Sequence, residues 1–203
     1  MQEEIVVKAP TTEALTPAQI TQKAEDLGVT KTEMSFGRSF ALSIMAGAFI
    51  AMGAMFFSLV VGDPALPFAI QRVLGGFLFC LGLILVVVAG AELFTGNTMI
   101  VMTAASKRIK WSAVWKNWIV VFFGNFLGAL VIVGLVFLSD MSAMNGGQVG
   151  QTMVSVAAGK MHADWLVLFA KGIMCNFLVC LGVWMAYASK TVADKILAVV
   201  FPI

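Results

Sequence analysis

The residues best suited to chemistry in this chain lie together at positions 89–98, in the sequence AGAELFTGNT. This stretch contains one carboxylate (Glu92), two threonine hydroxyls and one asparagine amide, all within a long apolar run. A carboxylate inside a membrane suggests a functional group by default. It can also accept hydrogen bonds that hold a loop in shape, and we favour this structural role for Glu92. We expect Gly90, Gly96 and Asn97 to shape the same loop.

The apolar run around this stretch, residues 68–103, is too long for one straight membrane helix. At about 1.5 Å per residue it would extend about 54 Å, whereas the hydrocarbon core of a bilayer is about 30 Å thick. We therefore predict a helix that breaks inside the membrane, with a first half over 71–89 and a second half over 97–106. Backbone amides freed at such a break need protein or water around them, so the break is expected to line a cavity or a path.

The composition predicts a polytopic membrane protein. The chain has 203 residues, of which 60% are hydrophobic and 12% charged, and its mean hydropathy is +0.95. A soluble domain of this size is not so apolar. One histidine and three cysteines, the latter all in apolar segments, have no metal-ligand spacing, and we expect no metal and no cofactor. The sequence has no phosphate-binding glycine loop and no basic patch for nucleic acid, so we expect no nucleic-acid partner.

The hydrophobic pattern predicts an all-α bundle with a polar N-terminal segment. This segment covers residues 1–35 and contains a short amphipathic helix at 17–27, with Thr16 as N-cap and Pro17 as first helical residue. The membrane domain covers residues 36–203. Its predicted elements are spans at 36–61, 111–138 and 165–188, the broken segment, a polar outer loop at 139–164 and a fifth apolar segment that starts at 196.

Positive charges predict the orientation of the bundle. The densest cluster, KRIK at 107–110, follows the broken segment, and the positive-inside rule places it in the cytoplasm. Counting the spans back places the N-terminus in the cytoplasm as well. Residues 196–203 would rise only about 12 Å, which leaves a terminal carboxylate inside hydrocarbon at a high cost in free energy. We therefore expect the natural chain to continue beyond Ile203.

Several motifs resemble those of the formate/nitrite transporter family. The strongest is GAELFTGN at 90–97, and further matches are KNW at 116–118, FGN at 123–125 and KGI at 171–173. Members of that family are pentameric, aquaporin-like anion channels or transporters. The resemblance implies an aquaporin-like bundle with a broken second transmembrane helix. It also implies that the fifth helix, with its acidic-histidine pair, is cut and that the sixth is absent; His162 does not match the central histidine.

The resemblance also implies a substrate pathway. Carried over by position, its residues are Leu93, Phe94 and Val179 at an inner constriction, Phe79 and Leu83 at an outer constriction, Thr95 as the pore-loop hydroxyl, Asn176 as a polar lining residue and Lys160 as the vestibule lysine. Composition alone favours ordinary helix packing for the five apolar residues in this set. Only the resemblance reverses that preference.

The implied function is passage of small monovalent anions, with formate as first choice, through a pore in each protomer of a homopentamer. The passage is expected to depend on pH or to be linked to protons, and the expected location is the inner membrane of a bacterium. A nitrite or hydrosulfide channel of the same family and a non-transporting truncated subunit stay open as alternatives. A membrane enzyme is disfavoured, because Glu92, Lys160, His162 and the cysteines form no nucleophile-base arrangement.

Overall fold

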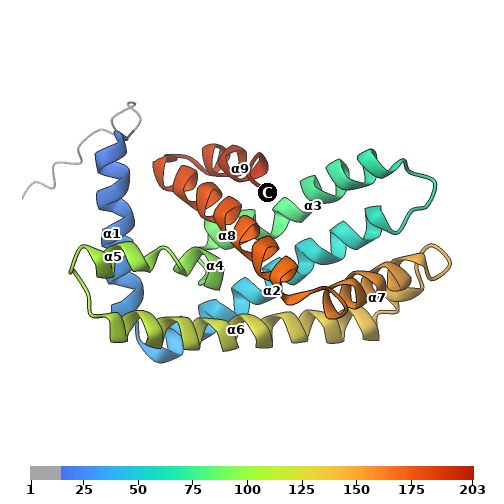
Figure 1. Cartoon of the computed structure of the whole chain (residues 1–203), viewed down its shortest axis with the longest axis horizontal. Coiled ribbons are helices and arrows are strands. Elements are labelled where there is room, and N and C mark those ends of the chain that lie inside the picture. The colour runs from blue at the N-terminus through green and yellow to red at the C-terminus, as the bar shows by residue number, and fades with distance from the viewer. Residues whose placement is uncertain (1–14) are drawn as a thin grey trace, which may run out of the picture.

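The computed structural model describes residues 15–203, and every element in that range is helical (Figure 1). Residues 1–14, the first part of the predicted N-terminal segment, lie outside the described residues. The elements in chain order are α1 (Pro17–Glu33), α2 (Phe36–Val61), α3 (Phe68–Ala89), α4 (Phe94–Asn97), α5 (Ile100–Ala105), α6 (Trp111–Leu138), the 3₁₀ turn η1 (Met141–Ala143), α7 (Gln148–Met161), α8 (Trp165–Ala188) and α9 (Val192–Val200).

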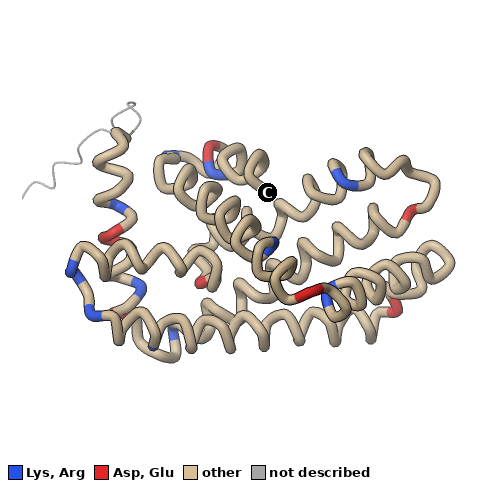
Figure 2. Tube along the Cα trace, viewed as in Figure 1, with Lys and Arg blue, Asp and Glu red and all other residues tan. Residues whose placement is uncertain are grey.

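Four of the described helices, α2, α3, α6 and α8, are long and apolar enough to cross a membrane. The predicted spans at 36–61, 111–138 and 165–188 are confirmed, and the predicted break in the second span is present between α3 and α5. Figure 2 shows that most charged residues lie at helix ends and in connections, which leaves the middles of the long helices apolar. This distribution suits a hydrocarbon environment because a charge at mid-membrane depth is expensive.

Several predicted elements have different bounds from those expected. The N-terminal helix, predicted at 17–27, extends to Glu33 in α1, the first half of the broken helix begins at Phe68 and not at 71, and the fifth apolar segment, predicted from 196, belongs to α9, which begins at Val192. The second half of the broken helix, predicted at 97–106, consists of two short helices, α4 and α5, because a turn at Thr98 and Met99 interrupts it. The stretch 139–164, predicted as a polar loop, contains the fourteen-residue helix α7. Four glycines, at 146, 147, 150 and 159, lower the helix propensity of this stretch and favour a loop in a prediction from sequence.

Close contact between backbones holds α2 against α6. A Cβ atom at Gly128 would overlap the carbonyl oxygen of Ile44, and one at Gly47 would overlap the backbone of Asn125. Only glycine allows the two helices to approach this closely. Such small-residue contacts replace the hydrophobic driving force that is missing between helices in lipid.

Much of the apolar surface of α6 and α8 is not covered within one chain. On α6, Phe122, Phe123 and Phe126 are 53%, 59% and 57% exposed. A soluble protein does not leave such a continuous apolar face uncovered, so lipid or neighbouring protomers must cover it.

Candidate functional site

The break begins where Gly90 ends α3 in a left-handed conformation. Gly90 has φ +67°, and its N–H and that of Ala91 both reach back to the carbonyl of Val86. A residue with a Cβ atom adopts this conformation only at a cost in free energy, so glycine is suited to the position. Residues 91–93 then form a non-helical loop that leads into α4 at Phe94.

The side chain of Asn125, in the middle of α6, holds this loop in place. Its Nδ2 donates to the carbonyl of Glu92 at 2.8 Å and to the carbonyl of Ser43 at 2.7 Å. Its Oδ1 accepts from the N–H of Phe94 at 2.8 Å. One amide thus satisfies backbone groups on both sides of the loop and links it to α2, which meets the requirement for internal partners at membrane depth.

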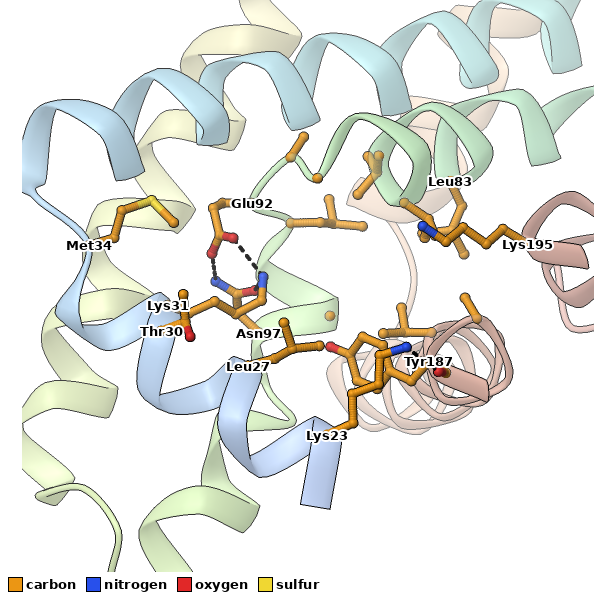
Figure 3. A pocket seen from close by; sticks show the side chains of 18 residues that line it. Lys23, Leu27, Thr30, Lys31, Met34, Leu83, Glu92, Asn97, Tyr187 and Lys195 are labelled. Atoms are coloured by element: carbon orange, nitrogen blue, oxygen red, sulfur yellow. Dashed lines mark hydrogen bonds and ion pairs between the residues drawn. The ribbon is translucent and has the colours of Figure 1, made fainter. Parts of the chain in front are cut away.

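Glu92 is 3% exposed and takes part in a polar network that reaches α1. Its carboxylate forms an ion pair with the Lys31 ammonium at 2.7 Å and accepts from Asn97 Nδ2, also at 2.7 Å (Figure 3). Lys31 Nζ donates to Asn97 Oδ1 at 2.9 Å, and Asn97 Nδ2 also donates to Asn117 Oδ1 at 3.0 Å. A buried charge needs such a set of partners, because an unpaired one costs several kcal/mol.

Helix α1 packs next to the break, and contacts with α5 and with Arg108 hold it there. Gly28 lies so close to the side chain of Thr103, in α5, that a Cβ atom there would overlap it. Arg108 pairs with Asp26 at 2.7 Å and with Glu25 at 3.4 Å. The hydrogen bond with Arg108 is the main reason that the pKa of the Asp26 carboxyl lies below its ordinary value. These contacts fix α1 across the end of the bundle near α5 (Figure 1).

A cavity of about 350 Å³ lies between α1, the break, α8 and α9. Its apolar wall includes Leu83, Leu93 and Val183. Three ammonium groups also reach it, those of Lys23, Lys31 and Lys195, and Glu92 is the one carboxylate in the lining (Figure 3). The lining therefore has a positive excess, although Lys31 is already paired with Glu92.

Some of the predicted pathway residues meet at this cavity. Leu83 and Leu93 line it, and Leu93 and Val179 pack against the buried cluster that contains Leu83. Phe94 does not line it: its ring packs against α6, with ring centroids 5.9 Å from Trp118 and 5.7 Å from Phe122.

The other predicted pathway residues lie away from the cavity. Phe79 is half-buried in α3, with its carbonyl against Gly53. Lys160 is exposed on α7. Thr95 and Asn176 are half-buried, and neither lines the cavity. The roles of all eight pathway residues stay predictions.

Thr98 joins the polar groups of α4 and α8. Its Oγ1 donates to the carbonyl of Thr95 at 2.6 Å and accepts from Asn176 Nδ2 at 3.2 Å. Asn176 Oδ1 is buried and has no partner among the described residues, and the Thr95 hydroxyl likewise forms no hydrogen bond there. A donor and an acceptor are thus left free on neighbouring elements.

Sequence reasoning assigned no role to the residues that build the network and the cavity charge, namely Lys23, Lys31, Asn117, Asn125 and Lys195, although the two asparagines belong to the KNW and FGN motifs. The two asparagines carry a signal, because an amide inside an apolar span must find polar partners. The lysines carry no such signal, because they lie in polar stretches that indicate a solvated surface.

Comparisons with known proteins give a consistent result. A family model described as "Formate/nitrite transporter" matches residues 18–203. The chain is 38% identical over 191 residues to the formate channel FocA of Haemophilus influenzae, covering 94% of this chain and 67% of that protein. It is 40% identical over 190 residues to FocA of Escherichia coli K12, covering 93% and 67%. It thus spans about two thirds of the length of these relatives.

Two solved structures are similar as well. One, titled "Pentameric formate channel with formate bound", aligns with a TM-score of 0.77 at 38% identity and covers 82% of this chain and 66% of that chain. The other, an "FNT family ion channel", has a TM-score of 0.81 at 27% identity and covers 91% and 74%. The expected all-α bundle with a broken second span is confirmed by these matches.

Proposed function

Because the chain belongs to the formate/nitrite transporter family, we propose that it acts in a membrane pore for small monovalent anions, with formate as the first candidate. The observation that carries this proposal is the break between α3 and α5. There an apolar span opens onto a cavity of about 350 Å³ that three lysines line. Similarity to relatives named formate channels supports formate over other anions. Nitrite is the second candidate because the family description includes it.

The apolar side chains near the break suit selection of a weak acid. We infer that Leu83, Leu93 and Val179 form a barrier to water and hydrated ions, as apolar constrictions do. An anion that takes up a proton before this barrier loses most of its desolvation penalty. The free Thr95 hydroxyl and the free Asn176 oxygen would hold the acid on the way. Phe79, Phe94 and Lys160 complete the proposed pathway.

We further propose that five copies assemble in the inner membrane of a bacterium with the N-terminus in the cytoplasm. The exposed aromatic face of α6 supports assembly, because lipid or a neighbouring copy must cover it. The positive cluster at 107–110 supports the orientation. Glu92, Gly90, Gly96 and Asn97 are proposed to shape the loop, and no chemical conversion of the anion is proposed.

Anion flux into proteoliposomes tests the function. Formate, nitrite and hydrosulfide are supplied separately at two pH values, to this chain and to a chimera that continues past Ile203 with the remaining helices of a formate-channel relative. We expect faster formate uptake at the lower pH. Equal uptake by empty vesicles and by both proteins would refute the proposal, and chemical turnover of the anion would favour an enzyme. Flux through the chimera alone would favour the alternative of a non-transporting subunit for this chain.

The substitution Thr95→Val tests the pathway in whichever of these proteins conducts. Valine keeps the shape of threonine and removes the hydroxyl, so formate flux is expected to fall about tenfold, as for the loss of one hydrogen bond in a dry path. Thr32→Val is the matched control, because the Thr32 hydroxyl bonds only within α1. Unchanged flux in Thr95→Val would remove Thr95 from the pathway.

A further inference from the structure

The ammonium groups of the three lysines in the cavity next to the break differ in how many hydrogen-bond and ion-pair partners they have. Lys31 is neutralised by Glu92 and bonded to Asn97. Lys23 donates one hydrogen bond, to the carbonyl of Tyr187 at 2.6 Å, and an ammonium group has three donors. The Lys195 ammonium forms neither a hydrogen bond nor an ion pair within residues 15–203.

Lys23 and Lys195 approach the cavity from different elements. Figure 3 shows Lys195 reaching from α9 toward Leu83, and Lys23 reaching from α1 toward Tyr187. Burial, followed by the charge of Lys195, lowers the pKa of the Lys23 ammonium below its ordinary value. Two like charges that face one space repel each other, and this repulsion is relieved when an anion lies between them.

Among the described residues, no carboxylate is positioned to relieve the repulsion between Lys23 and Lys195. Glu92, the one acidic residue in the lining, already pairs with Lys31. Asp194, next to Lys195 in sequence, accepts from the N–H groups of Thr191 and Lys190 in the cap of α9 and does not line the cavity. Among residues 15–203 the cavity therefore keeps a positive excess, which a small anion would neutralise.

We propose that Lys23 and Lys195 form an anion-binding subsite for a small carboxylate such as formate. The subsite lies in the cavity between α1, α8 and α9, on the α1 side of the apolar residues Leu83 and Leu93. A volume of about 350 Å³ holds a carboxylate of this size with several waters. The choice of formate rests on the proposed function, whereas the binding of a small anion follows from the cavity itself.

Saturation-transfer NMR on the formate proton tests the subsite without transport. The purified chain in a nonionic detergent is titrated with sodium formate at constant ionic strength. We expect saturable transfer with the parent chain and about tenfold weaker binding in Lys23→Met and in Lys195→Met, since each loses one charged partner of the anion. Lys195→Arg keeps the charge and should bind within about threefold of the parent.

Lys110→Met is the matched control, because Lys110 is exposed and does not line the cavity. It should bind formate as the parent does. Lys195→Met is the decisive variant, since Lys195 Nζ forms no hydrogen bond or ion pair within residues 15–203 whose loss would destabilise the protein. Parent-like binding by Lys195→Met, or the absence of saturable transfer in the parent, would overturn the proposal.

Flux measured in parallel separates this proposal from the proposed function. Flux in the parent together with equal binding by all variants would reject the subsite and keep the pore. Binding that depends on both lysines, without flux in any protein, would keep the subsite and reject the pore.

Discussion

Replacing Asn125 with leucine tests whether one side chain holds the break in shape. Leucine has a similar volume and cannot form the three hydrogen bonds that the amide makes to Ser43, Glu92 and Phe94. A neutral hydrogen bond contributes about 1 kcal/mol net, so the variant should lose about 3 kcal/mol of stability. On the scale that holds for globular domains of 150–250 residues, this loss lowers the unfolding midpoint by about 6–12 °C.

The buried thiol of Cys80 provides the assay. Cys80 is 2% exposed, so a thiol-reactive dye that fluoresces on coupling reports unfolding during a thermal ramp in detergent. The exposed thiol of Cys175 and the half-buried thiol of Cys180 are first replaced with serine to remove their background. The midpoint of the Asn125→Leu variant is then compared with that of this parent.

Asn176→Leu is the matched control, because it makes the same substitution at a poorly bonded amide. Asn176 loses one hydrogen bond, to Thr98 at 3.2 Å, and the substitution also removes the buried Oδ1 that has no partner. These two effects oppose each other, so the midpoint should move by less than about 2 °C. Equal midpoints for the two variants would refute the view that Asn125 holds the loop.

Three further predictions concern the backbone and the anchoring of α1. Gly90→Ala should lower the midpoint by about 2–8 °C, because alanine costs about 1–2 kcal/mol at φ +67° although no atom lies within 4 Å of the added Cβ. Gly134→Ala, in open space within α6, should raise it by about 2–4 °C, and a fall would contradict the argument from helix propensity. Arg108→Leu should increase hydrogen exchange of α1 at neutral pH. Arg108 lowers the pKa of the Asp26 carboxyl, so the anchoring is complete above the ordinary pKa of aspartate and is lost as the pH falls through the lowered pKa. The difference in hydrogen exchange between variant and parent should therefore vanish at low pH. A difference that is independent of pH would exclude the ion pair as its cause.

Much of the fold could be predicted from the sequence because hydrophobicity and length are local properties. The spans at 36–61, 111–138 and 165–188 end where the apolar run meets a glycine or serine that a charged residue follows, at 62–63, 139–140 and 189–190. Thr16 and Pro17 mark the start of α1, which has a capping box as its first turn, although the helix continues beyond the predicted end at Leu27 to Glu33. Helix α7 was not predicted in this way, since Gly150 and Gly159 inside it lower its helix propensity.

The site, like the fold, could be predicted only in part from the sequence. The sequence by itself determined that the second span must break, because 68–103 is too long for a bilayer and holds a carboxylate, and the GAELFTGN motif assigned the family. Only the tertiary structure decided the partners of that carboxylate. Glu92 meets Lys31, 61 positions earlier, because α1 folds back beneath the break. Lys23 and Lys195 share one cavity for the same reason: which charges lie face to face depends on how helices pack, and a linear pattern does not carry that information.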